Sequence, residues 1–576
     1  MKRLDWKDDL ASALLAGATM VALVATCADL GYARDEGFYF SAAGNYGRWF
    51  EQLFADPARA LDPKVVDGAW RVNSEHPGLI KSLFALSNLF LQKKWHLFAM
   101  EGTSYRFPAI VLSGICVALV YRWGAEARGR VAGAFAAVSL LAMPRFFYHA
   151  HLACFDVPIV SLFVLTTYCF WKTLREGGWA WPVATGLAFG LALDTKHNSW
   201  FLPILGATHA ALLWARARIA GQGNALEPRR ALSALVAMAA IGPVVMYALW
   251  PWIWHDTIAR LRGYAAFHLN HEYYNMEFFG RTYWTPPMPR AYAPVMTAAT
   301  VPAVTLGLFA LGLCLRARER ARSLARALVG KDGLVGRAGQ WLGRIGGRGA
   351  AGAEPGGTDL LWLLGIGVSY GAWISPNTPI FGGTKHWMTA YPFLALFAGA
   401  GFSWLVRVAR VEMRRARSQA LRRALRGPIV AGALGAVLAA GPVVETWRSH
   451  PWGLSSYTPL VGGAKGAATL GLNRTFWGYT TGSVVDYLNR EVQRNGAVYI
   501  HDTAWSSWEM LQKDGRLRKD IRAAASVTEA DFALYHHEQH MLGQEYQAWV
   551  AYGTVRPDHV AGLDGVPVIW VYRRKR

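Results

Sequence analysis

Two adjacent carboxylates, Asp35 and Glu36, follow the first long apolar stretch of the chain. Carboxylates at that depth lose hydration unless they face water, a cation or another partner. A carboxylate held beside a substrate hydroxyl can act as a general base, because it accepts the proton as the hydroxyl oxygen attacks. The same pair can also be the solvated start of a loop. The pattern therefore leaves two alternatives open, a catalytic base and an ordinary loop.

A third carboxylate, Asp156, lies two residues before Pro158, where a new apolar stretch begins. Proline suits the first turn of a helix, and an aspartate at that place can accept hydrogen bonds from free backbone N–H groups. Asp156 can therefore be a helix cap or a second catalytic carboxylate. Carboxylate oxygens and imidazole nitrogens also bind divalent ions. A candidate divalent cation, the one cofactor considered, would take its ligands from Glu75, His149, His151 and Asp156.

Several cations stand at the outer ends of apolar stretches. Each one alone can be a side chain that reaches toward lipid headgroups. Several together, facing carboxylates, would suit an anionic ligand such as a lipid-linked phosphate. Together with the neighbouring Glu75 and His76, the candidate substrate-binding residues are Lys81, Lys196, Arg281, Lys385 and His386. The segment 273–287 adds aromatic and amide groups, which a sugar site requires and which are also typical of a membrane-interface belt.

These residues must be positioned by membrane helices. Roughly 20 apolar residues cross a hydrocarbon core of about 30 Å, and eleven stretches fit that length. With the N-terminus in the cytoplasm, the strongly basic connections 316–358 and 407–427 fall on the cytoplasmic side, and the C-terminus falls outside. The expected spans are 10–30, 104–124, 131–148, 155–174, 179–196, 198–214, 231–254, 292–315, 359–375, 387–406 and 428–447.

The remaining segments divide the chain into two expected domains. Residues 1–447 form the membrane domain, and its long first outer loop, 31–103, includes an apolar part at 78–98 that we expect to lie in the membrane surface. The glycine-rich segment 346–357 is expected to be a flexible linker. Residues 448–576 read as a small extracytoplasmic α/β domain, with a helix at 484–492 and strands at 497–500, 530–535 and 566–572.

Composition excludes some classes of protein. The formal net charge is +22, but the charge is concentrated in short segments between apolar stretches, so we expect no nucleic-acid partner. The five cysteines lie in or beside apolar stretches without paired spacing, which argues against a disulfide framework and against a thiolate metal site. The sequence therefore predicts a mainly helical, multi-pass protein of a cell membrane, most simply a bacterial inner membrane.

In order along the chain, these residues resemble the membrane glycosyltransferases of the C-type fold, and most of all glycosyltransferase family 39. That family includes protein O-mannosyltransferases and enzymes like the aminoarabinose lipid A transferase. The matching segments are Asp35-Glu36, Glu75 to Lys81, Arg106 to Pro108, Asp156 to Pro158, Gly190 to Lys196 and His386 to Pro392, followed by His450 to Tyr457, Val461 to Gly463 and Phe476 to Gly478. The chain departs from the family at His76-Pro77-Gly78, where many relatives have two prolines.

The resemblance implies transfer of a sugar from a polyprenyl-phosphate sugar to an acceptor hydroxyl, on a protein or a glycolipid, at the outer face of the membrane. Asp35 would be the base of an inverting displacement, while Glu36 or Asp156 would orient the acceptor or a cation. The phosphate would meet the cations Lys81, Lys196, Arg281, Lys385 and His386. Two alternatives remain: a lipid or solute transporter, and a non-catalytic scaffold whose outer domain binds a partner.

Overall fold

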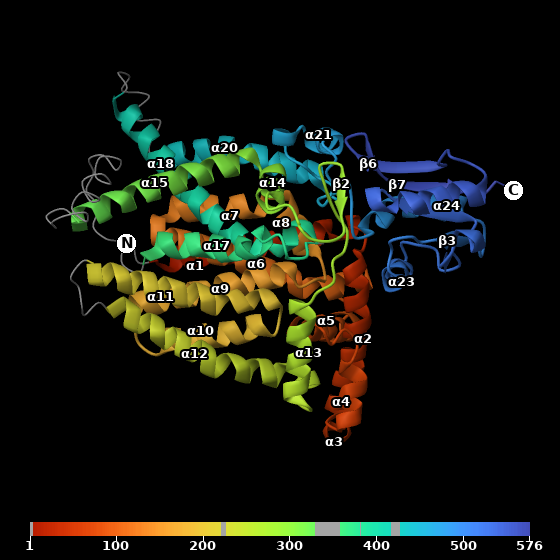
Figure 1. Cartoon of the computed structure of the whole chain (residues 1–576), viewed down its shortest axis with the longest axis horizontal. Helices are drawn as coiled ribbons and strands as arrows, with labels where there is room; N and C mark the ends of the chain where they lie inside the picture. The colour runs from red at the N-terminus through yellow and green to blue at the C-terminus, as the bar shows by residue number, and fades with distance from the viewer. Residues whose placement is uncertain (1–3, 220–225, 329–356, 381, 416–426, 576) are drawn as a thin grey trace.

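The computed structural model describes residues 4–219, 226–328, 357–380, 382–415 and 427–575. Within them, six helices are long and apolar enough to cross a membrane, or up to eight if two bent pairs each count as one span. The six are α1 (Trp6–Thr26), α6 (Glu101–Arg128), α9 (Asp156–Glu176), α12 (Leu226–Leu249), α18 (Tyr391–Arg415) with the preceding turn η7 (Met388–Ala390), and α20 (Gly427–Ser449). Figure 1 shows these helices running along the long axis of the molecule.

Prolines explain why two expected spans are bent. The stretch 131–148 is α7 (Arg130–Leu141) followed by α8 (Pro144–His151), at 69°. The stretch 292–315 is α14 (Tyr292–Thr300) followed by α15 (Ala303–Leu328), at 118°. Met143 and Val301 have extended backbone angles, as expected of residues that precede a proline.

The other expected spans are shorter helices. α10 (Ala180–Leu193) and α17 (Thr358–Ile374) are apolar but short, and α11 (Phe201–Ile219) follows the turn η3 (His197–Trp200). Each of the eleven expected stretches is thus helical, whereas length and apolarity support six to eight crossings. The count of eleven stays a prediction, and the expected linker falls outside the described residues except for Gly357.

Ion pairs join the termini of several helices at the side of the bundle where the N-terminus lies. Asp8, near the start of α1, accepts hydrogen bonds from Arg130 at the start of α7. Asp359, at the start of α17, pairs with Arg128 at the end of α6 and, at 3.1 Å, with Arg316 on α15. The described ends of the basic connections therefore lie at one end of the molecule, as the predicted sidedness requires.

Helices that lie across the opposite end form a second layer (Figure 1). We call this end the outer end, after the side of the membrane that the sequence predicts for it. After the turn η1 (Cys27–Asp29), the first outer loop forms α2 (Arg34–Ala55), α3 (Pro57–Ala60), α4 (Pro63–Trp70) and α5 (Leu79–Ser87), which continues as the π-helical η2 (Asn88–Lys94). At nine residues, α5 is too short to cross a membrane. The segment between α12 and α14, which we call the second outer loop, contains η4 (Pro251–Ile253), α13 (Thr257–Leu269) and the hairpin of β1 (Met276–Phe278) and β2 (Arg281–Tyr283).

The C-terminal region, residues 450–575, contains a five-stranded sheet in the order β4-β3-β5-β7-β6. Parallel pairing joins β3 (Ala497–Tyr499) to β4 (Arg522–Ala524) and β5 (Phe532–His536), and β7 (Val566–Arg573) pairs antiparallel with β5 and β6 (His559–Leu563). The helices are α21 (Gly463–Thr469), α22 (Val485–Glu491), α23 (Trp505–Lys513) and α24 (Leu542–Tyr552), with shorter turns at η8 (Pro459–Val461), η9 (Tyr479–Val484), η10 (Val527–Glu529) and η11 (Gln539–Met541). The expected helix and three strands are all present, and β4 and β6 are additional.

The C-terminal region packs directly on the first outer loop. One hydrophobic cluster contains Phe40 and Trp70 from that loop together with Leu488 and Val568 from the C-terminal region. A Cβ atom at Gly31 would lie 2.0 Å from the carbonyl oxygen of Tyr479, so only glycine allows this backbone contact. The two parts therefore share one core at the outer end of the bundle.

Candidate active site

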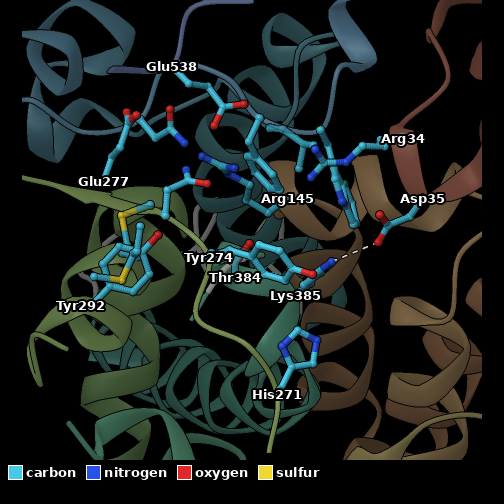
Figure 2. A pocket seen from close by; sticks show the side chains of 18 of the residues that line it. Arg34, Asp35, Arg145, His271, Tyr274, Glu277, Tyr292, Thr384, Lys385 and Glu538 are labelled. Atoms are coloured by element: carbon cyan, nitrogen blue, oxygen red, sulfur yellow. Dashed lines mark hydrogen bonds and ion pairs between the residues drawn. The ribbon is translucent and has the colours of Figure 1, made fainter. Parts of the chain in front are cut away.

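A pocket of about 440 Å³ opens where the outer helix ends, the first outer loop and the C-terminal region meet. Its wall takes residues from α2, the loop after α4, α8, the second outer loop, α14, the 3-10 turn η6 (Gly383–His386) and three parts of the C-terminal region. In Figure 2, Lys385 and Asp35 lie on one side of the pocket, Glu277 and Glu538 lie on another, and Arg145 projects between them.

Asp35 and Lys385 form an ion pair on the pocket wall. The Lys385 Nζ atom lies 3.3 Å from Asp35 Oδ2 and 3.9 Å from the ring centroid of Trp477. The Asp35 side chain is 23% exposed, whereas that of Lys385 is 7% exposed. Asp35 therefore keeps access to a molecule in the pocket while its charge is balanced by a lysine from a distant part of the sequence.

Glu36 lies in a different environment although it is the next residue. Its carboxylate is fully buried and forms a two-pronged pair with Arg106, with N–O distances of 2.7 and 2.8 Å. The backbone N–H groups of Ala33 and Ala153 donate to the same carboxylate, both at 2.9 Å. Glu36 does not line the pocket. Its contacts fix the first turn of α2 against α6, instead of offering an oxygen to an acceptor or a cation.

Asp156 forms the second aspartate–lysine pair of the outer end. Lys196 donates to Asp156 Oδ1 at 2.6 Å, and His149 Nδ1 lies 3.4 Å from Asp156 Oδ2. Neither Asp156 nor Lys196 lines the pocket, and both side chains are below one-tenth exposed. Lys385 is nevertheless an electrostatic neighbour of Asp156. The structure thus brings Asp35, Lys385, Asp156 and Lys196 into one charged group, of which Asp35 and Lys385 face the pocket.

The loop between α4 and α5 brings Glu75 and His76 to the pocket. Lys81 lies beneath this loop, fully buried, and donates to the carbonyl oxygens of Asn73 and His76 at 2.5 and 2.9 Å. Burial lowers the pKa of Lys81 to about 7. Burial and nearby cations also hold the pKa of His76 well below its usual range, so the His76 imidazole is neutral at pH 7. Lys81 therefore supports the loop instead of contacting a ligand in the pocket.

Two other predicted phosphate ligands lie outside the pocket. Arg281 is exposed on β2 and packs over the Tyr283 ring, because the hairpin turns its side chain toward solvent. His386 is buried against Trp373, and the backbone N–H of Gly382 donates to its Nε2 atom at 3.1 Å. Arg281 and His386 therefore do not line the pocket beside Lys385, although His386 is an electrostatic neighbour of Lys385 and Lys196; their role as phosphate ligands stays a prediction.

The predicted divalent-cation ligands do not converge either. His149 and Asp156 are in contact, but the His151 Nε2 atom lies 2.8 Å from Thr26 Oγ1 and His151 packs near His450. Among the described residues, one group of potential metal ligands lies close enough together to hold an ion: Glu277, Glu538 and His540. Their ligand atoms are all within 4.8 Å of one another.

Several residues of the pocket were not predicted from the sequence. Arg145, at the start of α8, is buried and packs over the Tyr457 ring. The sequence feature that could have pointed to Arg145 is its place inside an expected apolar span, directly after a proline. Glu277 and Glu538 are also buried, and they lie on segments more than 250 residues apart in sequence, so no local pattern joins them. Burial and the nearby carboxylates of Asp502 and Glu277 raise the pKa of Glu538 well above its usual range.

The arrangement combines an accessible carboxylate, two buried cations and aromatic and amide groups in one pocket. Asp35 can accept a proton from a hydroxyl group that enters the pocket. Lys385 and Arg145 can stabilise negative charge beside it. The rings and amides that could contact a sugar include Tyr274, Asn275, Tyr292, Asn473 and Trp477.

Comparison with protein families gives a match in the first half of the chain. Residues 86–247 match the sequence pattern of the family described as dolichyl-phosphate-mannose-protein mannosyltransferase. This segment includes Arg106, Asp156 and Lys196, so the resemblance inferred from the sequence is confirmed there. Asp35 and Lys385 lie outside it. No curated protein matches the chain significantly in sequence.

Solved structures of three glycosyltransferases are similar over most of the chain. ArnT from Cupriavidus metallidurans, bound to undecaprenyl phosphate, is 15% identical, with 97% of each chain covered and a TM-score of 0.48. The oligosaccharyltransferase AglB from Archaeoglobus fulgidus, with an inhibitory peptide and a dolichol-phosphate, is 10% identical, with 94% of this chain and 71% of that chain covered and a TM-score of 0.43. Arabinosyltransferase EmbB from Mycobacterium smegmatis is 13% identical, with 78% and 42% covered and a TM-score of 0.29. Likeness at this level establishes neither a shared reaction nor shared site residues.

Proposed function

We propose that the chain is a membrane glycosyltransferase that moves a sugar from a polyprenyl-phosphate carrier to a hydroxyl group of a protein or glycolipid acceptor. The reaction would take place at the outer face of the membrane. The observation that carries the proposal is the Asp35–Lys385 pair: an accessible carboxylate and a buried cation stand 3.3 Å apart on the wall of a pocket at the outer end of the bundle. The family match at residues 86–247 supports the same reaction class.

In the proposed reaction, Asp35 removes the proton of the acceptor hydroxyl as its oxygen attacks C1 of the sugar. A new C1–O bond forms, and the bond between C1 and the phosphate oxygen breaks with its electron pair on the phosphate. One base suffices for such a displacement, which inverts the configuration at C1. Lys385 and Arg145 would stabilise the charge of the leaving polyprenyl phosphate.

The pocket has the size and polarity that such a reaction needs. Its volume of about 440 Å³ falls in the range of small-molecule sites, roughly 300 to 1,000 Å³. A sugar and an acceptor hydroxyl fit this volume, while the long apolar carrier would extend along the bundle into the lipid. Phe38 and Met296 give the wall apolar patches beside the polar groups.

Transport is the main alternative. Transporters place their substrate sites near the middle of the membrane, often at broken helices in two related halves. Here the pocket lies at the outer end of the bundle, beneath the C-terminal region, and contains a carboxylate with access to a ligand. A scaffold without activity would not require a partly exposed aspartate beside a buried lysine. These features favour a transferase.

The test is to follow a lipid-linked sugar with the purified protein in lipid nanodiscs. Extracted polyprenyl-phosphate sugars and candidate acceptors are supplied, and donor loss and glycosidic product are measured by mass spectrometry. We expect donor consumption coupled to product in the wild type and its loss in Asp35→Asn. Glu51→Gln, an exposed change on the same helix, is the matched control and should keep activity.

Two outcomes would contradict the proposal. Near-normal transfer by folded Asp35→Asn would remove Asp35 as the base. Stoichiometric movement of the lipid across the bilayer, with no glycosidic product for any acceptor tested, would instead indicate a transporter.

A further inference from the structure

Three side chains that bind metals well meet where the β1–β2 hairpin touches the C-terminal region. Glu277 lies on β1, and Glu538 and His540 follow β5. The His540 Nδ1 atom is 3.1 Å from Glu277 Oε1 and 3.8 Å from Glu538 Oε2. One ligand atom from each residue lies within 4.8 Å of the other two. A single ion can therefore reach all three with small side-chain adjustments.

The surroundings leave the two carboxylates short of positive charge. The side chains of Glu277 and Glu538 are each only 5% exposed, and that of His540 is 9% exposed. Among the residues that the structure describes, no lysine or arginine pairs directly with Glu277 or Glu538. Arg34 acts on Glu538 from a greater distance and is itself paired with Asp502 at 2.7 Å. Buried carboxylates that face each other without a cation are costly, because neither is solvated by water.

Neighbouring groups orient the three side chains and supply a further oxygen. The backbone N–H of His540 donates to Glu277 Oε1 at 3.0 Å, and Asn275 Nδ2 lies 3.0 Å from His540 Nδ1. Asn473 contacts Glu538 through its side chain, and its buried Oδ1 atom has no hydrogen-bond partner among the described residues. This oxygen lines the same pocket, next to the group of three.

We propose that Glu277, Glu538 and His540 bind a divalent transition-metal ion of the Zn²⁺ type. Two carboxylates and one imidazole are a donor set suited to such ions, whereas Mg²⁺ and Ca²⁺ favour all-oxygen sites. Three protein ligands also leave a coordination position open. Because Glu277 and Glu538 line the pocket, a molecule in the pocket could reach that position.

The ion would join two parts of the chain across the pocket wall. The hairpin already contacts the C-terminal region through Gly280, whose N–H donates to the carbonyl of Gly471 at 2.8 Å and whose carbonyl accepts from Gln539 at 2.9 Å. A metal bound to Glu277 and to Glu538 would strengthen this junction and hold the wall in place. The proposal does not depend on glycosyl transfer, and its ligands differ from the set expected from the sequence.

The test measures metal binding by tag-free protein in detergent. Protein stripped with a chelator is titrated with Zn²⁺ against a competing chelator, and bound metal is counted by mass spectrometry. We expect about one Zn²⁺ per chain in the wild type and affinity at least about tenfold weaker in Glu277→Gln and Glu538→Gln. Glu272→Gln, an exposed change in the same loop, should bind as the wild type does.

Folding is checked separately, so that a loss of binding cannot be mistaken for unfolding. Each metal-free variant is compared with the metal-free wild type by thermal unfolding and gel filtration. Zn²⁺ should raise the melting temperature of the wild type and of Glu272→Gln, but not that of Glu538→Gln.

Three results would overturn the proposal. One is a wild type that binds no Zn²⁺ at millimolar concentration, and another is Zn²⁺ binding that is unchanged in Glu277→Gln and Glu538→Gln. The third is binding lost in Glu75→Gln instead, which would return the ion to the ligands expected from the sequence. The transfer assay with Asp35→Asn is read independently, so failure of either proposal leaves the other standing.

Discussion

The first turn of α2 places two adjacent carboxylates in two environments. Asp35 faces the pocket and shares a lysine from η6 across 3.3 Å, with nearly a quarter of its side chain exposed. Glu36 faces the interior, where Arg106 and two backbone N–H groups occupy its oxygens. Adjacent residues on a helix point about 100° apart. One carboxylate can therefore serve a ligand while its neighbour holds the helix that presents it.

The two kinds of ion pair should respond differently to mutation. A buried pair loses heavily when one partner is removed, because the other charge is left without water or a counter-ion. A partly exposed pair loses little, because water replaces the missing partner. Stability measurements should therefore report on Glu36, and activity measurements should report on Asp35.

The largest effect is expected for Glu36→Gln. The substitution leaves the buried Arg106 uncompensated, and we expect the free energy of unfolding to fall by about 3–5 kcal/mol. Unfolding of the purified protein in detergent measures the change. Glu51→Gln, which removes an exposed partner of Lys93 on the same helix, should change it by less than about 1 kcal/mol. Equal losses in the two variants would remove the distinction between the environments.

Asp35→Asn should show the reverse pattern. Loss of the proposed general base lowers the transfer rate at least about 100-fold, whereas the free energy of unfolding should fall by less than in Glu36→Gln, because Asp35 is partly exposed and Lys385 keeps Asp156 as an electrostatic neighbour. Single-turnover assays with saturating donor, alongside unfolding curves, separate the two quantities. A variant that is unstable but active would mean that Asp35 and Glu36 have exchanged roles.

Lys81 is a third case, a buried cation with no carboxylate in direct contact among the described residues. Its contribution to stability should depend on pH. The pKa of Lys81 is about 7 in the folded protein and about 10.4 in an unfolded chain. Between these values the unfolded chain holds a proton that the folded protein releases, so stability rises with pH by roughly 1 kcal/mol per pH unit. Melting temperatures of the wild type should therefore rise from pH 7.5 to 8.5 relative to Lys81→Met.

The matched control for that measurement is Lys93→Met, which removes an exposed lysine. Its pH dependence should equal that of the wild type. If Lys81→Met also keeps the wild-type slope, Lys81 remains charged in the folded protein and the loop around Glu75 is held in another way.

The smallest effect is the coupling between Asp35 and Lys385 in stability. A double-mutant cycle with Asp35→Asn and Lys385→Gln should give less than about 1 kcal/mol, because Asp35 is partly exposed and Lys385 also has Asp156 as an electrostatic neighbour. The corresponding cycle for Glu36 and Arg106 should give clearly more. A strong Asp35–Lys385 coupling would indicate a closed pair that substrate has to break open.

Local patterns predicted much of the fold because membrane helices and strands have distinct apolar periods. The span expected at 155–174 is α9, and the strand expected at 566–572 is β7. The two bends were not predicted from the sequence, although Pro144 and Pro302 stand directly after them. A count of consecutive apolar residues treats a bent pair of helices as one stretch. The additional strands β4 and β6 carry no strong alternation in sequence.

The site was harder to predict because it depends on rotation and on distant contacts. Sequence identified Asp35 and Lys385, yet nothing local tells whether Asp35 or Glu36 faces inward on α2. Lys81 and His386 have the chemistry of phosphate ligands, but both are buried: Lys81 Nζ donates to backbone carbonyl oxygens, and His386 Nε2 accepts from a backbone N–H. Glu277 and Glu538 meet only after the hairpin and the C-terminal region have packed together.

The close approach at Gly31 and Gly37 has a consequence for biosynthesis. A Cβ at Gly31 would collide with Tyr479, and a Cβ at Gly37 would lie 2.7 Å from Ser507 Oγ, so residues made early are covered by residues made late. The ribosome releases Asp35 some 440 residues before Trp477, which packs against its lysine partner. The pocket wall is therefore complete only after the last fifth of the chain has been made and has packed on the first outer loop. A chain that ends before Trp477 would lack part of the pocket wall.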